Sequence, residues 1–112
     1  MSFGAKLREI REEAGIGLSE MARLIGVTKV YVSDVERGRR APLSLARIRQ
    51  VAEILGCAPF DLYVYAVRSR GHAVLPTADV SEEQSRLAAV LSYHWGDFDN
   101  DEVKKMMGAA VK

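Results

Sequence analysis

The sequence predicts an all-α fold, with five helices in a first domain of residues 1–70 and two more in a C-terminal extension of residues 79–112. Apolar residues recur at the 3.6-residue spacing of a helix face in each of these segments. Glycines and helix-capping residues separate the segments. The run from residue 64 to 67 is the only strand-like stretch, and helical spacing fits it equally well. Residues 71–78, GHAVLPTA, read as a linker because they contain a proline and have no clear period.

The first two helices should cover residues 2–14 and 18–25, because glycines follow the first and flank the second. The inward-facing residues expected for the first helix are Phe3, Leu7, Ile10 and Ala14. Those expected for the second are Met21, Ala22, Leu24 and Ile25, of which the small Ala22 would let two helix backbones approach closely. A very short turn at residues 26–27 leads into a third helix, and this arrangement makes a helix-turn-helix.

The third helix lies in the stretch from Val27 to Pro42, VTKVYVSDVERGRRAP. Thr28 is a favourable N-cap, and Gly38 stands where the helix should stop. The valines expected to face inward are Val27, Val32 and Val35. The residues expected on the outer side are Lys29, Val30, Tyr31 and Asp34. Three arginines follow the helix, and an outward helix face beside arginines suits the major groove of DNA.

The fourth and fifth helices should begin at residues 44–45 and 59. Ser44 is a plausible N-cap of the fourth helix, and Gly56 ends that helix. Pro59 is preset for the first helical position of the fifth helix, which Gly71 closes. The apolar stripe expected for the fourth helix is Leu45, Ile48, Val51, Ala52 and Leu55. The stripe expected for the fifth is Phe60, Tyr63, Val64 and Val67, at i, i+3, i+4 and i+7.

The C-terminal extension contains two capping-box patterns, which predict the starts of its two helices. Ser81 with Gln84 begins a sixth helix that runs to about His94 and is broken by Gly96. Asp99 with Glu102 begins the seventh. The sixth helix presents Leu87, Ala88, Leu91 and Trp95. The seventh presents Val103, Met106, Met107 and Ala110, with Phe98 and Val103 placed as a hydrophobic staple around its start.

The net charge of +1 hides a difference between the two parts of the chain. Residues 1–70 carry 12 Lys and Arg against 8 Asp and Glu, a net +4, whereas residues 71–112 carry 4 against 7, a net −3. A polyanion is therefore a candidate partner for the first part. No apolar run could span a bilayer and no secretion signal is visible, and Cys57 is the only cysteine. These features lead us to expect a cytoplasmic protein without membrane association.

Short motifs of the first domain resemble the Cro/C1-type helix-turn-helix family of phage repressors and bacterial transcriptional regulators. The resemblance covers about Phe3 to Tyr63. The motifs that carry it are Leu7-x-x-Ile10-Arg11, MARLIGV at residues 21–27, VSDVERG at 32–38, Pro42 and VAEILG at 51–56. It implies a five-helix repressor-like domain that docks its third helix into the major groove of double-stranded DNA, usually as a homodimer on a palindromic operator.

By position, the resemblance also implies roles for single residues. The implied base-reading residues are Lys29, Val30, Tyr31, Ser33 and Asp34. The implied phosphate-contacting residues are Thr28, Arg37, Arg39 and Arg40. Arg11 and Glu36 correspond to a buried structural ion pair of the family. The family often has Gln at the start of the second helix, where it contacts a phosphate, and Leu18 stands there instead.

Three functions are compatible with these observations. We expect a sequence-specific DNA-binding regulator, in particular a repressor, whose C-terminal residues Trp95, Phe98, Val103, Met106 and Met107 form a dimer or partner contact. The alternatives are an antitoxin that autoregulates its operon and a protein-interaction module that has lost DNA binding. Asp34 and Leu18 favour the last of these. The sequence has no nucleophile motif, zinc spacing or glycine-rich phosphate loop, so we expect neither an enzyme nor a cofactor or metal.

Overall fold

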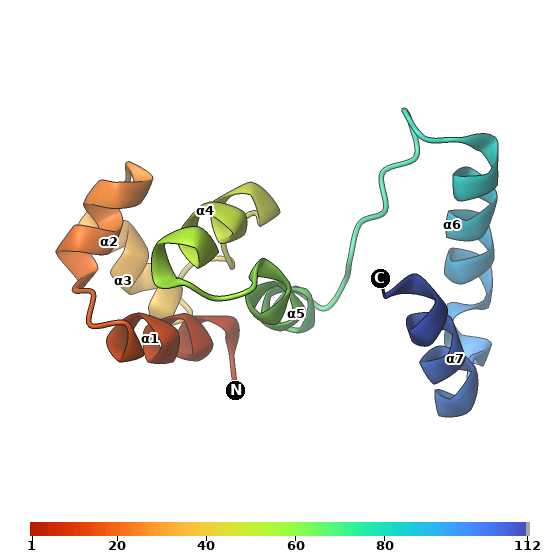
Figure 1. Cartoon of the computed structure of the whole chain (residues 1–112), viewed down its shortest axis with the longest axis horizontal. Helices are drawn as coiled ribbons and strands as arrows, with labels where there is room; N and C mark the ends of the chain where they lie inside the picture. The colour runs from red at the N-terminus through yellow and green to blue at the C-terminus, as the bar shows by residue number, and fades with distance from the viewer. Residues whose placement is uncertain (112) are drawn as a thin grey trace. The chain divides into compact units, whose positions relative to one another are not determined.

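A computed structural model describes residues 1–111 and contains seven α-helices and one short 3-10 helix in that range (Figure 1). The first five are α1 Phe3–Glu13, α2 Leu18–Ile25, α3 Lys29–Glu36, α4 Leu45–Leu55 and α5 Pro59–Arg70. Then come α6 Glu82–His94, the 3-10 helix η1 Trp95–Asp97 and α7 Asn100–Ala110. The described residues contain no strand, and the prediction of an all-α fold is confirmed.

The chain divides into two compact units, one of residues 1–73 and one that begins at Val74. In the first unit α1 packs on α3 and α5, α2 packs on α3 and α4, and α4 also packs on α5. Helix-capping side chains define several of the helix starts. Ser2 and Ser44 accept hydrogen bonds from backbone N–H groups in the first turns of α1 and α4. None of the described helices has the length and apolarity that crossing a bilayer requires.

One apolar core holds the first unit together. It contains residues from all five helices and from the segment between α3 and α4. The buried apolar residues are Phe3, Leu7, Met21, Ala22, Ile25, Val32, Val35, Leu43, Ile48, Val51, Ala52, Leu62 and Ala66. Close packing of large side chains such as Phe3, Met21 and Ile48 fixes how α3 is presented to solvent, because Val32 and Val35 of that helix are anchored in the same core.

The inward faces predicted for α2 and α5 are partly wrong. Leu62 and Ala66 are the buried residues of α5, whereas Phe60 is 68% exposed and Val64 is 37% exposed. Apolar residues lie around much of α5, so helical spacing alone is satisfied by two different faces. In α2, Leu24 is 39% exposed rather than inward-facing. Ala14, the last residue of the stripe expected for α1, is also exposed.

A glycine allows α1 to approach the end of α3 closely in the first unit. Gly4 is buried in the first turn of α1, where that helix crosses the end of α3. A Cβ atom built at Gly4 would overlap the backbone carbonyl oxygens of Val35 and Glu36. Ala22, the residue expected to allow close packing, is buried as well, but the position that tolerates no side chain is Gly4.

The second unit consists of α6, η1 and α7, and none of its described residues is fully buried. At the start of α7, the Asp99 N–H donates to Glu102 Oε1 at 3.2 Å and the Glu102 N–H donates to Asp99 Oδ1 at 2.8 Å, which completes a capping box. At Ser81 the hydroxyl oxygen accepts from the Gln84 N–H at 3.1 Å. Gly96, expected to break the sixth helix, lies within η1, which continues from His94.

Candidate nucleic-acid interface

Helices α2 and α3 form a helix-turn-helix with a very short connection. Gly26 ends α2 with a φ of +72°, a left-handed conformation that side chains disfavour. The Val27 N–H donates to the Ala22 carbonyl oxygen at 2.9 Å and so closes the turn. The Thr28 hydroxyl oxygen then accepts from the Tyr31 N–H at 3.1 Å and caps α3. The sequence therefore turns the chain and starts the next helix within three residues.

The outward side of α3 carries the residues that the resemblance assigns to base reading. Lys29 and Val30 are exposed, and Val30 keeps 67% of its surface accessible. Tyr31, Ser33 and Asp34 are half-buried. The opposite side of the helix is fixed in the core, so this outward side has one defined orientation relative to the first unit. An ammonium group and an apolar side chain on one exposed helix side can meet a guanine edge and a thymine methyl group.

Arg11 and Glu36 form a bidentate ion pair between α1 and α3. Arg11 Nε lies 2.7 Å from Glu36 Oε2, and Arg11 Nη2 lies 2.9 Å from Oε1. The two side chains are only 8% and 5% exposed. The hydrogen-bonded Glu36 carboxylate raises the pKa of Arg11. Arg11 Nη1 also donates to the Ile16 carbonyl oxygen at 2.8 Å, so the guanidinium joins α1, the turn before α2, and α3.

A second polar cluster lies on the side of the first unit that α3 presents to solvent. Arg40 Nε is 3.9 Å from Asp34 Oδ2, and the Arg40 Cζ atom lies 5.1 Å from the centre of the Tyr31 ring. Arg47 Cζ lies 6.0 Å from the same ring. Arg47 has no role in the sequence interpretation, since nothing in the local pattern of α4 distinguishes it from its exposed neighbour Arg49. The Asp34 carboxylate thus has a cation beside it, which reduces its repulsion of a phosphate.

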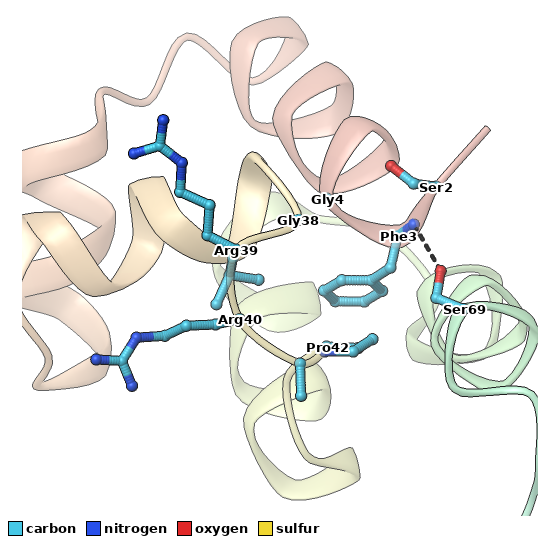
Figure 2. Close-up of a pocket in the computed structure, with 10 residues that line it drawn as sticks. Ser2, Phe3, Gly4, Gly38, Arg39, Arg40, Pro42 and Ser69 are labelled. Atoms are coloured by element: carbon cyan, nitrogen blue, oxygen red, sulfur yellow. Dashed lines mark hydrogen bonds between the residues drawn. The ribbon is translucent and has the colours of Figure 1, made fainter.

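The loop between α3 and α4 carries Arg39 and Arg40, and hydrogen bonds from α5 fix its backbone. Arg70 Nη2 donates to the carbonyl oxygens of Pro42 and Leu43 at 2.9 and 2.6 Å. One residue earlier, Ser69 Oγ accepts from the Phe3 N–H at 3.1 Å. Figure 2 shows that the side chains of Arg39 and Arg40 extend away from Phe3. Their exposed guanidinium groups are therefore available to phosphates, and the backbone that carries them is fixed.

An open hollow of about 520 Å³ lies between this loop and the ends of α1 and α5 (Figure 2). Its walls include the apolar side chains of Phe3, Val35 and Pro42. The hydroxyl of Ser69 is already engaged by the Phe3 N–H. Among the described residues, no group of three His, Cys, Asp or Glu side chains could hold a metal ion.

The second unit exposes much of the apolar surface predicted to be a dimer or partner contact. Trp95 is 69% exposed and Met107 is 56% exposed, whereas Phe98, Val103 and Met106 are half-buried. The Trp95 and Phe98 rings meet edge to face with their centres 6.5 Å apart. The sequence interpretation did not include Tyr93 and Val90, which are 84% and 51% exposed. Both are apolar residues of α6 that lie outside its expected stripe.

Comparison with known proteins relates the first unit to helix-turn-helix transcriptional regulators. The helix-turn-helix domain family model matches residues 2–62. The HTH-type transcriptional regulator DdrOP3 of Deinococcus deserti is 37% identical over 62 residues, which are 55% of this chain and 47% of that protein. The HTH-type transcriptional regulator SinR of Bacillus subtilis is 27% identical over 85 residues, which are 76% of this chain and 72% of SinR. This chain therefore spans about half the length of DdrOP3 and 72% of the length of SinR.

Solved structures extend the comparison beyond the first unit. The structure of the clp gene regulator ClgR of Corynebacterium glutamicum is similar to this chain with a TM-score of 0.51, and the two sequences are 31% identical. The similarity covers 84% of this chain and 88% of the ClgR chain.

Proposed function

This chain belongs to the Cro/C1-type helix-turn-helix family, and we propose on that premise that it is a sequence-specific, DNA-binding transcriptional regulator. The observation that carries the proposal is the outward side of α3, where Lys29 and Val30 are exposed in the first turn of a helix anchored in the core. Arg39 and Arg40 stand exposed in the loop that follows this helix. A helix with an exposed outer side next to arginine side chains fits the major groove of DNA.

The proposed contacts divide into base reading and backbone positioning. Lys29 donates to guanine O6 and N7, Val30 packs on a thymine methyl group, and Asp34 accepts from cytosine N4. Tyr31 and Ser33 lie beside them on α3 and complete the base-reading set. The phosphate-contacting set is Thr28, Arg37, Arg39 and Arg40. Phosphate contacts hold the domain in register without reading the sequence, so the two groups should respond differently to substitution.

The proposed regulator acts as a homodimer and represses by occupying a palindromic operator. One helix-turn-helix covers a small surface, and two half-sites about 34 Å apart combine the contacts of two copies. The second unit supports this role, because none of its described residues is fully buried and large apolar side chains such as Trp95 and Met107 stay exposed. A helical segment of fewer than about 40 residues usually needs a partner to bury its apolar surface.

Selection from a random-sequence duplex library tests the proposal. The whole chain should enrich a symmetric sequence, and that selected duplex then serves as the probe. Lys29→Ala should reduce the preference for the selected duplex over an unrelated one by roughly five- to 150-fold, because a good base contact contributes about 1–3 kcal/mol. Arg39→Ala should weaken binding to both duplexes alike and reduce the slope of log affinity against log salt by about 0.9.

Lys104→Ala is the matched control, since it removes one exposed positive charge from the second unit. It should leave both the preference and the salt slope close to those of the unaltered chain. If Lys29→Ala and Arg39→Ala both behave like this control, the residue roles are wrong. If the unaltered chain enriches no sequence, the proposed function is wrong. A reporter gene placed behind the selected duplex tests the regulatory direction, and a repressor lowers its expression.

A further inference from the structure

Arg47 reaches from the first turn of α4 to both helices of the helix-turn-helix. Its Nη1 atom donates to the Ile25 carbonyl oxygen at the end of α2, at 3.1 Å. Its Cζ atom lies 6.0 Å from the centre of the Tyr31 ring on α3. Arg47 is half-buried, whereas its neighbour Arg49 is exposed. One side chain therefore contacts the helix before the turn and the aromatic residue after it.

Two physical effects favour this placement of a guanidinium group. The last carbonyl groups of a helix lack partners within the helix, and a cation beside them is stabilised by the helix dipole. The face of a tyrosine ring is electronegative and attracts a guanidinium group. Arg40 approaches the same ring at 5.1 Å, but its side chain is 56% exposed and it has no hydrogen bond to the backbone of α2. Arg47 is thus the anchored cation of the two.

We propose that Arg47 is a positioning residue for sequence recognition and that it acts through Tyr31. This inference rests on the DNA-binding function proposed above. Because Arg47 is hydrogen-bonded to the end of α2 and also faces the Tyr31 ring, it limits that ring to one orientation before DNA arrives. A side chain that is already ordered loses less freedom on binding, so its contact contributes more to affinity for the correct sequence. Arg40 remains free to leave the ring and Asp34 for a phosphate.

The identity of the residue matters in this arrangement. A guanidinium group spreads its charge over a plane with several fixed N–H groups, so it can face the ring while one of those groups bonds to the Ile25 carbonyl oxygen. A lysine at the same place can donate to the carbonyl but has no flat surface for the ring. Arg47→Lys should therefore keep the charge and the stability while losing part of the sequence preference.

The test measures the affinity of the whole chain for its selected duplex and for an unrelated duplex at several salt concentrations. The variants are Arg47→Ala, Arg47→Lys, Tyr31→Leu and Arg47→Ala with Tyr31→Leu, and Arg49→Ala is the control. Arg47→Ala should lower the preference for the selected duplex roughly fivefold and leave the salt slope unchanged. The double variant should be no worse than Tyr31→Leu alone, because Arg47 acts through the tyrosine.

Several results would overturn the proposal. A uniform loss on both duplexes with a smaller salt slope would make Arg47 an ordinary phosphate contact. Additive losses in the double variant would show that Arg47 does not act through Tyr31. Equal behaviour of Arg47→Ala and Arg49→Ala, with normal selection by the unaltered chain, would remove this inference alone. Failure of the unaltered chain to select any duplex would remove the proposed function as well. If Arg47→Ala does not fold, Arg47→Lys and Tyr31→Leu decide.

Discussion

The Arg11 guanidinium group joins three parts of the first unit: α1, the turn before α2, and α3. It pairs with Glu36 through two hydrogen bonds and donates a third to the Ile16 carbonyl oxygen. Both side chains of the pair are less than a tenth exposed. A buried pair of this kind adds little net stability compared with apolar residues, but breaking one half leaves an uncompensated charge in the interior. Its effect is therefore to enforce one relative position of α1 and α3.

Arg11→Met should lower the free energy of unfolding by about 3–5 kcal/mol, because it leaves the Glu36 carboxylate buried without its cation. The double variant Arg11→Met with Glu36→Leu should recover most of that loss. Urea denaturation followed by circular dichroism measures both. Arg8→Met is the matched control on the same helix, since Arg8 and its partner Glu12 are 64% and 55% exposed. Its expected cost is about 1 kcal/mol or less. Equal costs at the two positions would contradict this account of the buried pair.

At the scale of elements, the contact between α1 and the end of α3 decides how α3 is held. Gly4 lets the two backbones meet, and the Arg11–Glu36 pair joins the same helices within two turns. Val32 and Val35 then fix the inner side of α3 in the core. A shift of α1 would therefore move α3 and the residues that it presents to solvent.

Gly4→Ala should destabilise the first unit by about 1–3 kcal/mol, since the added methyl group meets the fixed carbonyl oxygens of Val35 and Glu36. The steric cost itself is larger than this net value, because it must also offset the roughly 1 kcal/mol that alanine gains over glycine in a helix. Thermal and urea denaturation measure the change. Ala5→Leu is the control, because it enlarges an exposed side chain next along the same helix. A Gly4→Ala chain more stable than the original would show that the helices separate without difficulty.

At the scale of the whole molecule, a basic first part carries the candidate interface and an acidic second part carries exposed apolar surface. The first unit has its own core, drawn entirely from residues 3–66. The second unit has no fully buried residue in its described part. This contrast favours a first unit that is stable alone and a second unit that depends on association with another copy.

Truncation after Ala78 should leave a folded monomer at concentrations where the whole chain is a dimer. Sedimentation or light scattering measures the mass. Affinity for a duplex with two half-sites should fall at least about tenfold, because the two contacts are no longer linked, while affinity for a single half-site should change little. Met107→Glu in the whole chain gives a point-variant counterpart. A truncated chain that still dimerises would move the interface to the first unit, where Phe60 and Val64 of α5 are exposed.

The limits of the helices could be predicted because they depend on neighbouring residues. Glycines with a positive φ at positions 26, 56 and 71 end α2, α4 and α5, and Thr28, Ser44, Ser81 and Asp99 cap the starts of four helices. These preferences act between residues within one helical turn, so they can be predicted directly from the sequence. The all-α class and the outward exposure of Lys29 and Val30 follow from the same local patterns.

Several contacts between distant parts of the chain were decided by the tertiary structure alone. The buried face of α5, the close approach at Gly4, and the reach of Arg47 to Ile25 and Tyr31 all depend on helices far apart in sequence. Helical spacing on α5 permits two faces, and only packing against α1 and α4 selects the one with Leu62 and Ala66. A local pattern shows that a helix has an apolar side. The packing of the neighbouring helices decides which side chains this apolar side contacts. It also decides which polar groups find partners.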